Sequence, residues 1–482
     1  MSFKGLQIGL SGLITSQVQI TTAGKNVSNA NTQGYSRQTV ITTPSEFNMG
    51  VKYVSTRQIR SYLKDNHFRV ENSAYAKASV KADGLATLED YLAEPSGYSI
   101  NETLVKFFSA VADLSSDPTS LTARSQVVQT ALNMTDAINN IYNKYIKYQS
   151  EIDDAIVFDV ERINYLASKV SDLNRRIKFY EADGKEMANE LRDQRNNFLD
   201  EISKYVNISV FENPDGTVRV EIGSRALIDD SGVHELQIVK KPNEIDGERD
   251  VSKIVWEDGE EVNITSGEIY GYIELRDGGG LLSSGNTAFG IPYFIDKLNT
   301  LARAIAININ DLHSSGYTIP NEDNGYTSQT GIDFFAAKDG SSYISAKNIT
   351  VSDVIIRNYY NIAASDTFVN ETNKANNNIL TKILDLQEGI DVTVDGVNIG
   401  NFHTFITQIT SELGTVVSEA KTDLQAHESV LMAVENSRLS EMGVSIDEET
   451  VNLIQFQAAY QAAARLITII NENLEILINR MG

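Results

Sequence analysis

The sequence contains no cysteine and only one tryptophan among its 482 residues. Without thiols the chain can form no disulfide bond, no thiolate nucleophile and no cysteine-ligated metal site. Basic residues are also scarce, since 41 lysines and arginines stand against 65 acidic residues, for a net charge of −24. Nucleic acid and anionic membranes both require positive potential in a partner, so we expect no nucleic acid among the partners of this chain.

Long apolar runs are missing as well. The first twenty residues are interrupted by Lys4, Gln7 and Gln17, so they lack the unbroken apolar region of a secretory signal. The most apolar C-terminal stretch is broken by Arg465 and Glu472, and no run reaches the ~18–20 residues that a membrane span needs. We therefore expect no membrane insertion, and any export must use a route without a cleaved signal peptide.

Familiar catalytic patterns are not found in the sequence. The five histidines are isolated from one another, and none has the spacing of a zinc-binding helix. Acidic pairs such as Asp153-Asp154 could in principle serve glycoside hydrolysis, but composition alone predicts such pairs in a chain with 65 acids. The G-x-S-x-G turn of many hydrolases does not occur. We expect no catalytic residue, no metal site, no cofactor and no enzymatic activity.

Seven-residue apolar repeats mark both ends of the chain. At the C-terminus one row of positions recurs every seven residues from Ile446 to Met481, with a second row three residues after it. At the N-terminus the same spacing runs from Phe3 to Val27. Such a pattern is typical of a helix that buries a narrow stripe against another helix. We predict that the terminal helices pack on each other or on neighbouring subunits, and therefore that the chain assembles with copies of itself.

These repeats supply most of the residues that we predict at a subunit interface. They are Leu6, Leu10, Leu13, Ile20 and Val27 near the N-terminus, and Leu453, Phe456, Tyr460, Ile467, Ile470, Leu474 and Leu477 near the C-terminus.

Between the two ends, helical and strand-like patterns alternate. After a helix over 1–30, residues 36–60 look strand-like, and 62–112 and 119–200 look helical with a new helix starting at Pro118. Eight apolar residues spaced along 151–180 indicate an extended helix that packs lengthwise on others. Short β-prone runs separated by turns follow. Helical patterns then resume over the three segments 291–313, 373–390 and 401 to the end, with a capping box at Ser445.

This order predicts an α+β fold in which outer helices enclose inner helices and β-rich material. We expect a terminal coiled-coil core domain, a long-helix rod domain and a small inserted β domain. The expected boundaries are 1–35 with 445–482 for the core domain, 36–204 with 271–313 and 373–444 for the rod, 205–270 for the outer β domain, and 314–372 for a variable loop and β region attached to the outer domain.

Two terminal motifs resemble those of a known family. Residues 26–38, with the sequence NVSNANTQGYSRQ, resemble the N-terminal signature shared by bacterial flagellar rod, hook and hook-associated proteins. The GYSRQ ending is the form typical of the FlgK family of hook–filament junction proteins. Residues 443–462 resemble the C-terminal motif of that family, and internal blocks such as 114–118 and 271–277 extend the similarity over most of the chain. The resemblance adds Asn31, Thr32, Gly34 and Tyr35 to the expected interface.

The resemblance implies a structural role at the junction between flagellar hook and filament. It implies the hook protein, hook-associated protein 3 and a cytoplasmic export chaperone at the C-terminal region as partners, and an extracellular location reached by type III export. Many relatives carry a larger variable insertion in the middle of the chain, which is reduced here to about 317–370. Two alternatives remain: another axial component, such as flagellin or hook-associated protein 3, and a secreted glycosidase on a flagellar scaffold, which would need a carboxylate pair in a cleft of the middle domain.

Overall fold

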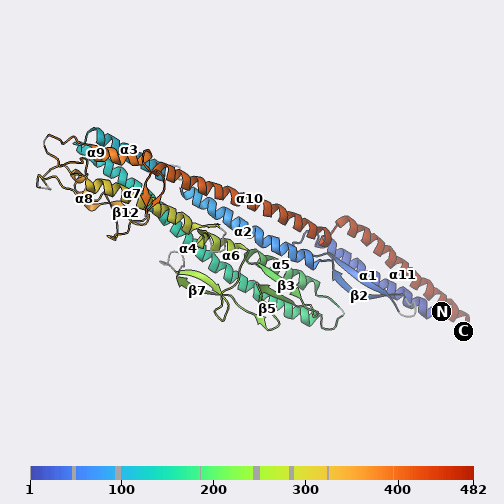
Figure 1. Ribbon diagram of the computed structural model, residues 1–482. Helices are drawn as coiled ribbons and strands as arrows, with labels where there is room; N and C mark the ends of the chain where they lie inside the picture. The colour runs from blue at the N-terminus through green and yellow to red at the C-terminus, as the bar shows by residue number, and fades with distance from the viewer. Residues whose placement is uncertain are drawn as a thin grey trace.

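The computed structural model describes residues 2–45, 50–92, 99–184, 186–242, 250–281, 287–322, 325–370, 372–394 and 396–481. Figure 1 shows an elongated molecule with both chain termini at one end, where the first and last helices lie side by side. Long helices run from there toward the opposite end, and the strands β3 to β8 lie along one flank. Among the described residues, no helix combines the length and the apolar character required to cross a membrane.

Helices account for most of the chain, which confirms the helical part of the predicted α+β class. They are α1 Ser2–Ser28, α2 Tyr62–Leu92, α3 Ile100–Ser116, α4 Leu121–Tyr180, α5 Asn189–Tyr205, α6 Glu268–Asp277, α7 Ile291–Ser315, α8 Asp353–Arg357, α9 Asn378–Glu388, α10 Phe402–Met442 and α11 Ile446–Met481, with a 3₁₀ turn η2 at Tyr359–Asn361.

The strands form small antiparallel sheets. They are β1 Gln38–Pro44, β2 Val51–Gln58, β3 Ile208–Glu212, β4 Val218–Ile222, β5 Arg225–Asp229, β6 Gly232–Val233, β7 Gln237–Pro242, β8 Asp250–Val255, β9 Gly279–Leu281, β10 Thr287–Phe289, β11 Phe335–Ala337, β12 Ile349–Val351, β13 Thr393–Val394 and β14 Val397–Asn398. The largest sheet has the order β3-β4-β5-β6, and the other strands pair in twos. The strands predicted in 36–60 and 205–270 are therefore confirmed.

The central element of the rod is α4, a helix of 60 residues. All eight apolar residues of the predicted stripe are buried, from Ile152 to Ile177. Helices α3 and α5 pack along α4, and the same helix contacts α6, α7 and several strands. The prediction of an extended helix that packs lengthwise on others is confirmed, and α4 joins the core along the length of the rod.

Three helix boundaries differ from the prediction. The helical segment predicted over 62–112 is two helices, since α2 ends at Leu92 and α3 begins at Ile100. Pro118 lies in the loop before α4 and not in its first turn, because Ser120 is the N-cap and accepts a hydrogen bond from the Ala123 N–H (3.3 Å). The helical segment predicted over 119–200 is two helices, since α4 ends at Tyr180 and α5 begins at Asn189. Glu181 stabilises the turn between them, because its carboxylate accepts the Ala188 N–H (2.9 Å).

The region 314–372 corrects one predicted domain assignment. Its strands β11 and β12 and the turn η2 pack against α4 and α7, at the end of the rod farthest from the termini (Figure 1). Buried Arg124 donates a hydrogen bond to the Ile362 carbonyl (2.6 Å), and buried His313 accepts one from the Ala363 N–H (2.9 Å). Attachment of this region to the outer β domain was therefore wrong. The polar composition concealed the few apolar residues, such as Phe335, that join the core.

Candidate assembly interface

Helices α1 and α11 pack against each other along their length. The residues of α11 that the heptad pattern selected, from Leu453 through Ile467 to Leu474, are half-buried, whereas most of their neighbours are exposed. Three glycines of α1, at spacings of four and three, face α11: Gly5, Gly9 and Gly12. Further along α1, the small residues Ser16 and Ala23 are buried.

The small residues of α1 allow the two helices to approach closely. A Cβ atom on Gly9 would lie 2.7 Å from Ile467 Cγ1, and one on Gly5 would lie 2.7 Å from Ile470 Cδ1. Carbon atoms in ordinary contact are about 3.5–4.0 Å apart, so larger residues at these positions would push α1 away from α11. The apolar row of α11 thus inserts its isoleucines where α1 has no side chain.

The predicted N-terminal stripe is only partly covered in the single chain. Leu6, Leu13, Ile20 and Val27 are only half-buried. Leu10 is 48% exposed, and the side chain of Phe3 lies outside the described residues. Since α11 occupies the neighbouring face of α1, much of the leucine-rich face is uncovered in the single chain.

Three further residues of the predicted C-terminal rows fall into the same pattern. Phe456, Tyr460 and Ile470 are half-buried on the α11 face toward α1, and the side chain of Leu477 lies outside the described residues. The predicted residues of both helices that the structure describes are therefore half-buried, apart from the exposed Leu10, and Ile467 and Ile470 approach α1 directly. Their place in a subunit interface stays a prediction.

A second apolar row on α11 was missed by the sequence analysis. Val451, Ile454, Ile469 and Ile476 are each more than half exposed, and Ala458 and Ala462 stand between them on the same helix. Their spacing fits a helical stripe offset from the first row, so a search for two interleaved repeats could have found it. Scattered exposed apolar residues are ordinary, but a row that follows one helix face marks a contact surface.

The motif at the end of α1 folds into a polar cluster centred on Asn26. This side chain is 1% exposed, and its amide donates to the Gln38 carbonyl (2.9 Å) and to Glu449 Oε2 (3.2 Å). Its Oδ1 accepts from the Gln38 N–H (3.0 Å) and from the Tyr35 hydroxyl (2.9 Å). Burial, with the charge of Asp193 in second place, raises the pKa of Tyr35 above its usual range, so the hydroxyl stays a donor. Asn26 therefore joins α1, the motif loop and α11.

The adjoining arginine of the motif connects the loop to the last two helices. Arg37 Nε donates to Glu449 Oε1 (2.7 Å), and its Nη1 lies 3.0 Å from Glu448 Oε2. The Arg37 N–H donates to the Met442 carbonyl at the end of α10 (2.8 Å). Ser445 accepts a hydrogen bond from the Glu448 N–H (3.4 Å), which confirms the predicted cap of α11. The turn between α10 and α11 is thus held by the N-terminal motif.

The remaining motif residues divide into buried and exposed sets. Gly34 has a φ of +77°, and a Cβ there would lie 1.9 Å from Asn197 Oδ1 on α5, so only glycine fits. The Ser36 hydroxyl donates to Asp193 Oδ1 of α5 (2.7 Å). Asn31 and Thr32, by contrast, are exposed. Part of the motif therefore shapes the fold, and part remains available to another molecule.

Below the motif, a buried charge network connects the motif to the rod. Arg60 Nε donates to Asp65 Oδ2 (2.6 Å), and Arg438 Nη1 donates to Asp200 Oδ2 (2.6 Å). The charge of Asp65 raises the pKa of Arg60 although burial alone would lower it, so the guanidinium remains charged. Since these residues come from the loop after β2 and from α2, α5 and α10, the network joins the segment that follows the hairpin to three helices of the rod.

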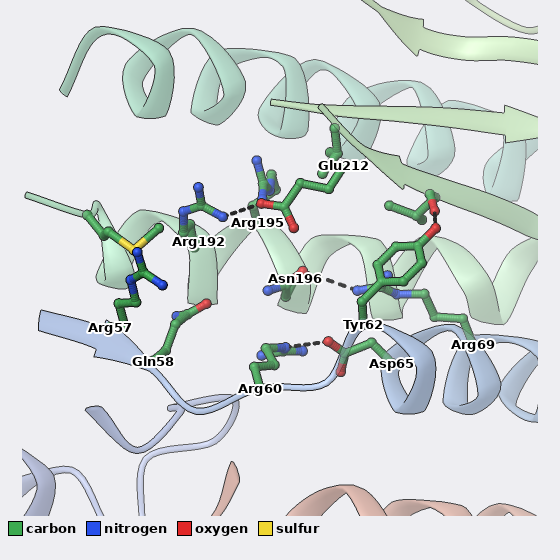
Figure 2. Close-up of a pocket in the computed structure, with 13 residues that line it drawn as sticks. Arg57, Gln58, Arg60, Tyr62, Asp65, Arg69, Arg192, Arg195, Asn196 and Glu212 are labelled. Carbon is green, nitrogen blue, oxygen red and sulfur yellow. Dashed lines mark hydrogen bonds and ion pairs between the residues drawn. The ribbon is translucent and has the colours of Figure 1, made fainter. Parts of the chain in front are cut away.

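An arginine-lined cavity of about 250 Å³ lies next to this network (Figure 2). Its two acidic residues are each paired with an arginine, Asp65 with Arg60 and Glu212 with Arg192. Among the described residues, no group of three or more His, Cys, Asp or Glu side chains is placed to hold a metal ion.

Two family models match the sequence. The helical domain of flagellar hook-associated protein FlgK matches residues 85–335, just over half of the chain. The C-terminal model of flagellar basal body rod FlgEFG proteins matches residues 435–481, which include α11.

Individual relatives agree with these matches. The chain is 28% identical over 521 residues to flagellar hook-associated protein 1 of Bacillus subtilis, covering 100% of this chain and 99% of that protein. Flagellar hook-associated protein 1 of Escherichia coli is 22% identical over 555 residues, with 98% of each chain covered. The flagellar hook junction protein FlgK from Burkholderia pseudomallei has a similar structure, with a TM-score of 0.62 at 11% identity, over 78% of this chain and 100% of that one.

Proposed function

This chain belongs to the FlgK family of flagellar hook-associated proteins and has their structural role at the hook–filament junction; from this premise we propose that its subunits stack through the exposed apolar faces of α1 and α11. The single observation that carries this proposal is the pair of uncovered rows on the terminal helices. On α11, Ile454 is 63% exposed and Ile469 is 54% exposed. On α1, Leu10 and Ile14 are exposed to a similar extent.

The two rows suit repeated association of identical subunits. In this proposal the α1–α11 contact within the chain forms a two-helix unit whose outer faces remain apolar. A face of α1 on one subunit can then pack on a face of α11 on the next, which is a head-to-tail contact that closes into a ring or continues as a helix. The exposed motif residues Asn31 and Thr32 lie at the base of this unit and extend the same interface.

The same surface accounts for the proposed partners. We expect the hook protein on one side of the assembled junction and hook-associated protein 3 on the other, with contacts that include the terminal helices. Before assembly, an uncovered apolar row is an aggregation hazard, and an export chaperone that covers α11 in the cytoplasm would remove it. The absence of cysteine suits passage of an unfolded chain through the type III apparatus to the cell exterior, because no disulfide bond can block threading.

A non-enzymatic role is part of the proposal. Asp65 and Glu212 line the arginine-rich cavity, and each is engaged by an arginine. A glycosidase needs two carboxyl groups free to flank the bond that it cleaves, and both carboxylates here are already bonded to arginine side chains. This pairing argues against the alternative of a secreted glycosidase.

Ile469→Asp tests the proposed subunit contact directly. Because Ile469 is more than half exposed, the substitution should leave the stability of the monomer nearly unchanged, within about 0.5 kcal/mol. In an assembled junction the carboxylate would be buried without a partner, at a cost of several kcal/mol. We expect a strain that carries this variant to export the protein normally, to lack attached filaments and to shed flagellin into the medium.

A matched control separates the position from the added charge. Thr468→Asp introduces the same charge on the same helix, at an exposed polar position that lies about 100° round the helix from Ile469 and so off the proposed face. This strain should keep its filaments and swim. Normal filaments on the Ile469→Asp strain would refute the proposed interface, while the family membership of the chain would stand.

A further inference from the structure

The arginine-lined cavity lies where the β1–β2 hairpin meets the rod. Its walls come from β2, the loop after it, α2, α5 and the strands β3 and β4. Five guanidinium groups line a space of about 250 Å³, namely those of Arg57, Arg60, Arg69, Arg192 and Arg195 (Figure 2). Five arginines around one small cavity are unexpected in a chain whose net charge is −24.

Three of the five arginines have carboxylate partners. Arg60 pairs with Asp65 (2.6 Å), Arg69 with Asp200 (2.8 Å) and Arg192 with Glu181 (2.7 Å). Arg57 and Arg195 form no ion pair with any described carboxylate. The cavity therefore has two cations without a direct counter-charge, one from the hairpin and one from the rod.

Arg195 is the more unusual of the two. It is 2% exposed, and its Nη1 donates to Asn174 Oδ1 (3.1 Å) and to the Gly216 carbonyl (2.6 Å). Its buried Nε has no hydrogen-bond partner among the described residues. Burial, and in second place the charge of Arg192, lower the pKa of Arg195 to about 10, although the charges of Glu212 and Glu181 act in the opposite direction. Buried charges are normally paired directly, so the unpartnered Nε–H of Arg195 suits an anionic ligand.

We propose that this cavity binds one small tetrahedral oxyanion from solution, of the phosphate or sulfate class, between Arg57 and Arg195. Guanidinium groups present several N–H donors in a plane and match the oxygen atoms of such anions. Arg57 is exposed and stands at the mouth of the cavity, so an anion can enter from solvent, whereas Arg195 lies at the inner wall.

The bound anion would connect two parts of the molecule. Arg57 belongs to β2, which packs near α1, and Arg195 belongs to α5 of the rod. An oxyanion between them would therefore strengthen the attachment of the hairpin, and with it the terminal helix pair, to the rod. This inference is independent of the proposed stacking through α1 and α11, since it concerns the isolated chain.

Titration calorimetry of the purified full-length chain with inorganic phosphate tests the site, in a chloride buffer of matched ionic strength. We expect saturable binding of one phosphate per chain, competition by sulfate, and a higher midpoint of thermal unfolding in phosphate. Arg57→Gln should weaken phosphate binding at least about tenfold, because it removes a charge-assisted hydrogen bond. Arg57→Lys, which keeps the charge, should recover most of the affinity.

Lys52→Gln is the matched control for the lost charge. Lys52 is exposed on the same strand and does not line the cavity, so its substitution should leave phosphate affinity within about twofold of the original. Each of three results would overturn the proposal. These are no saturable binding up to ~50 mM phosphate, equal affinity of the Arg57→Gln and Lys52→Gln variants, and binding of acetate as strong as that of phosphate, which would show that the site does not select a tetrahedral oxyanion.

Discussion

Replacement of Asn26 by alanine should loosen the terminal helix pair from the rod. The side chain forms four hydrogen bonds, to both backbone groups of Gln38, to the Tyr35 hydroxyl and to Glu449. Alanine would leave the two buried backbone groups of Gln38 without these partners, at about 1–3 kcal/mol each. Glu449 would retain its ion pair with Arg37, so its share of the loss is smaller. We expect a total cost of about 3–5 kcal/mol in the local free energy of opening.

Amide hydrogen exchange of the purified chain measures this local quantity. Since about 1.4 kcal/mol changes an equilibrium constant tenfold, peptides that cover the end of α1 and the start of α11 should exchange more than a hundredfold faster in the variant. Peptides from the middle of α4 should be unaffected, because this part of the rod lies away from α1 and α11 (Figure 1).

Asn31→Ala provides the comparison, because Asn31 belongs to the same motif but is exposed. Its exchange rates should match those of the unmodified chain, even though the substitution should weaken assembly. Asn26→Asp should be at least as damaging as Asn26→Ala, since it would place a second buried carboxylate beside Glu449. The reasoning fails if the Asn26→Ala and Asn31→Ala variants exchange at rates within threefold of each other.

Three further predictions concern other parts of the molecule. Gly9→Ala should destabilise the α1–α11 contact by about 1–2 kcal/mol, because the added Cβ overpacks it. Gly24→Ala should instead stabilise α1 by about 0.5–1 kcal/mol, because no atom lies within 4 Å of its added Cβ. Amide exchange rates in α1 compare the two variants. Burial raises the pKa of Asp159 to about 7, so the stabilisation by its protonated form is complete below pH ~4 and is lost as the pH rises through 7. At pH 8, Asp159→Asn should therefore raise the free energy of unfolding by on the order of 2–4 kcal/mol, which thermal unfolding would detect as a higher midpoint. The exposed control Asp154→Asn should leave the midpoint unchanged. Burial lowers the pKa of His313 to about 4, so its neutral form stabilises the fold fully above pH ~6.5. As the pH drops to 4, the free energy of unfolding should fall by up to about 3 kcal/mol. Amide exchange of peptides from 330–365, corrected for the intrinsic rate, should become faster accordingly.

Much of the fold could be predicted from local patterns. The eight apolar residues of 151–180 all lie on the buried face of α4, because helical periodicity records directly which side faces the core. The cap at Ser445 was readable because a capping box involves only residues within one turn. The break at 181–188 was not, since it depends on how Glu181 meets Arg192 after the chain has reversed.

Periodicity alone, however, could not tell which partner covers an apolar row. The sequence contained a complete row on α11 and a leucine-rich row on α1, and it was natural to expect the two rows to meet. In the structure Ile467 and Ile470 of the α11 row lie over Gly9 and Gly5 of α1, where a larger residue would clash. Leu10 and Ile14 on α1 remain exposed.

The sequence by itself determined the α+β class, the positions of the long helices, the two terminal motifs and, through them, the family. These properties depend on residues close together in the chain. Only the tertiary structure decided that Asn26 and Glu449 share a hydrogen bond across 423 positions, that residues 314–372 join the far end of the rod, and that Arg57 and Arg195 face one cavity. Such contacts depend on how distant segments are brought together, and no local pattern of spacing or charge encodes the distance between them.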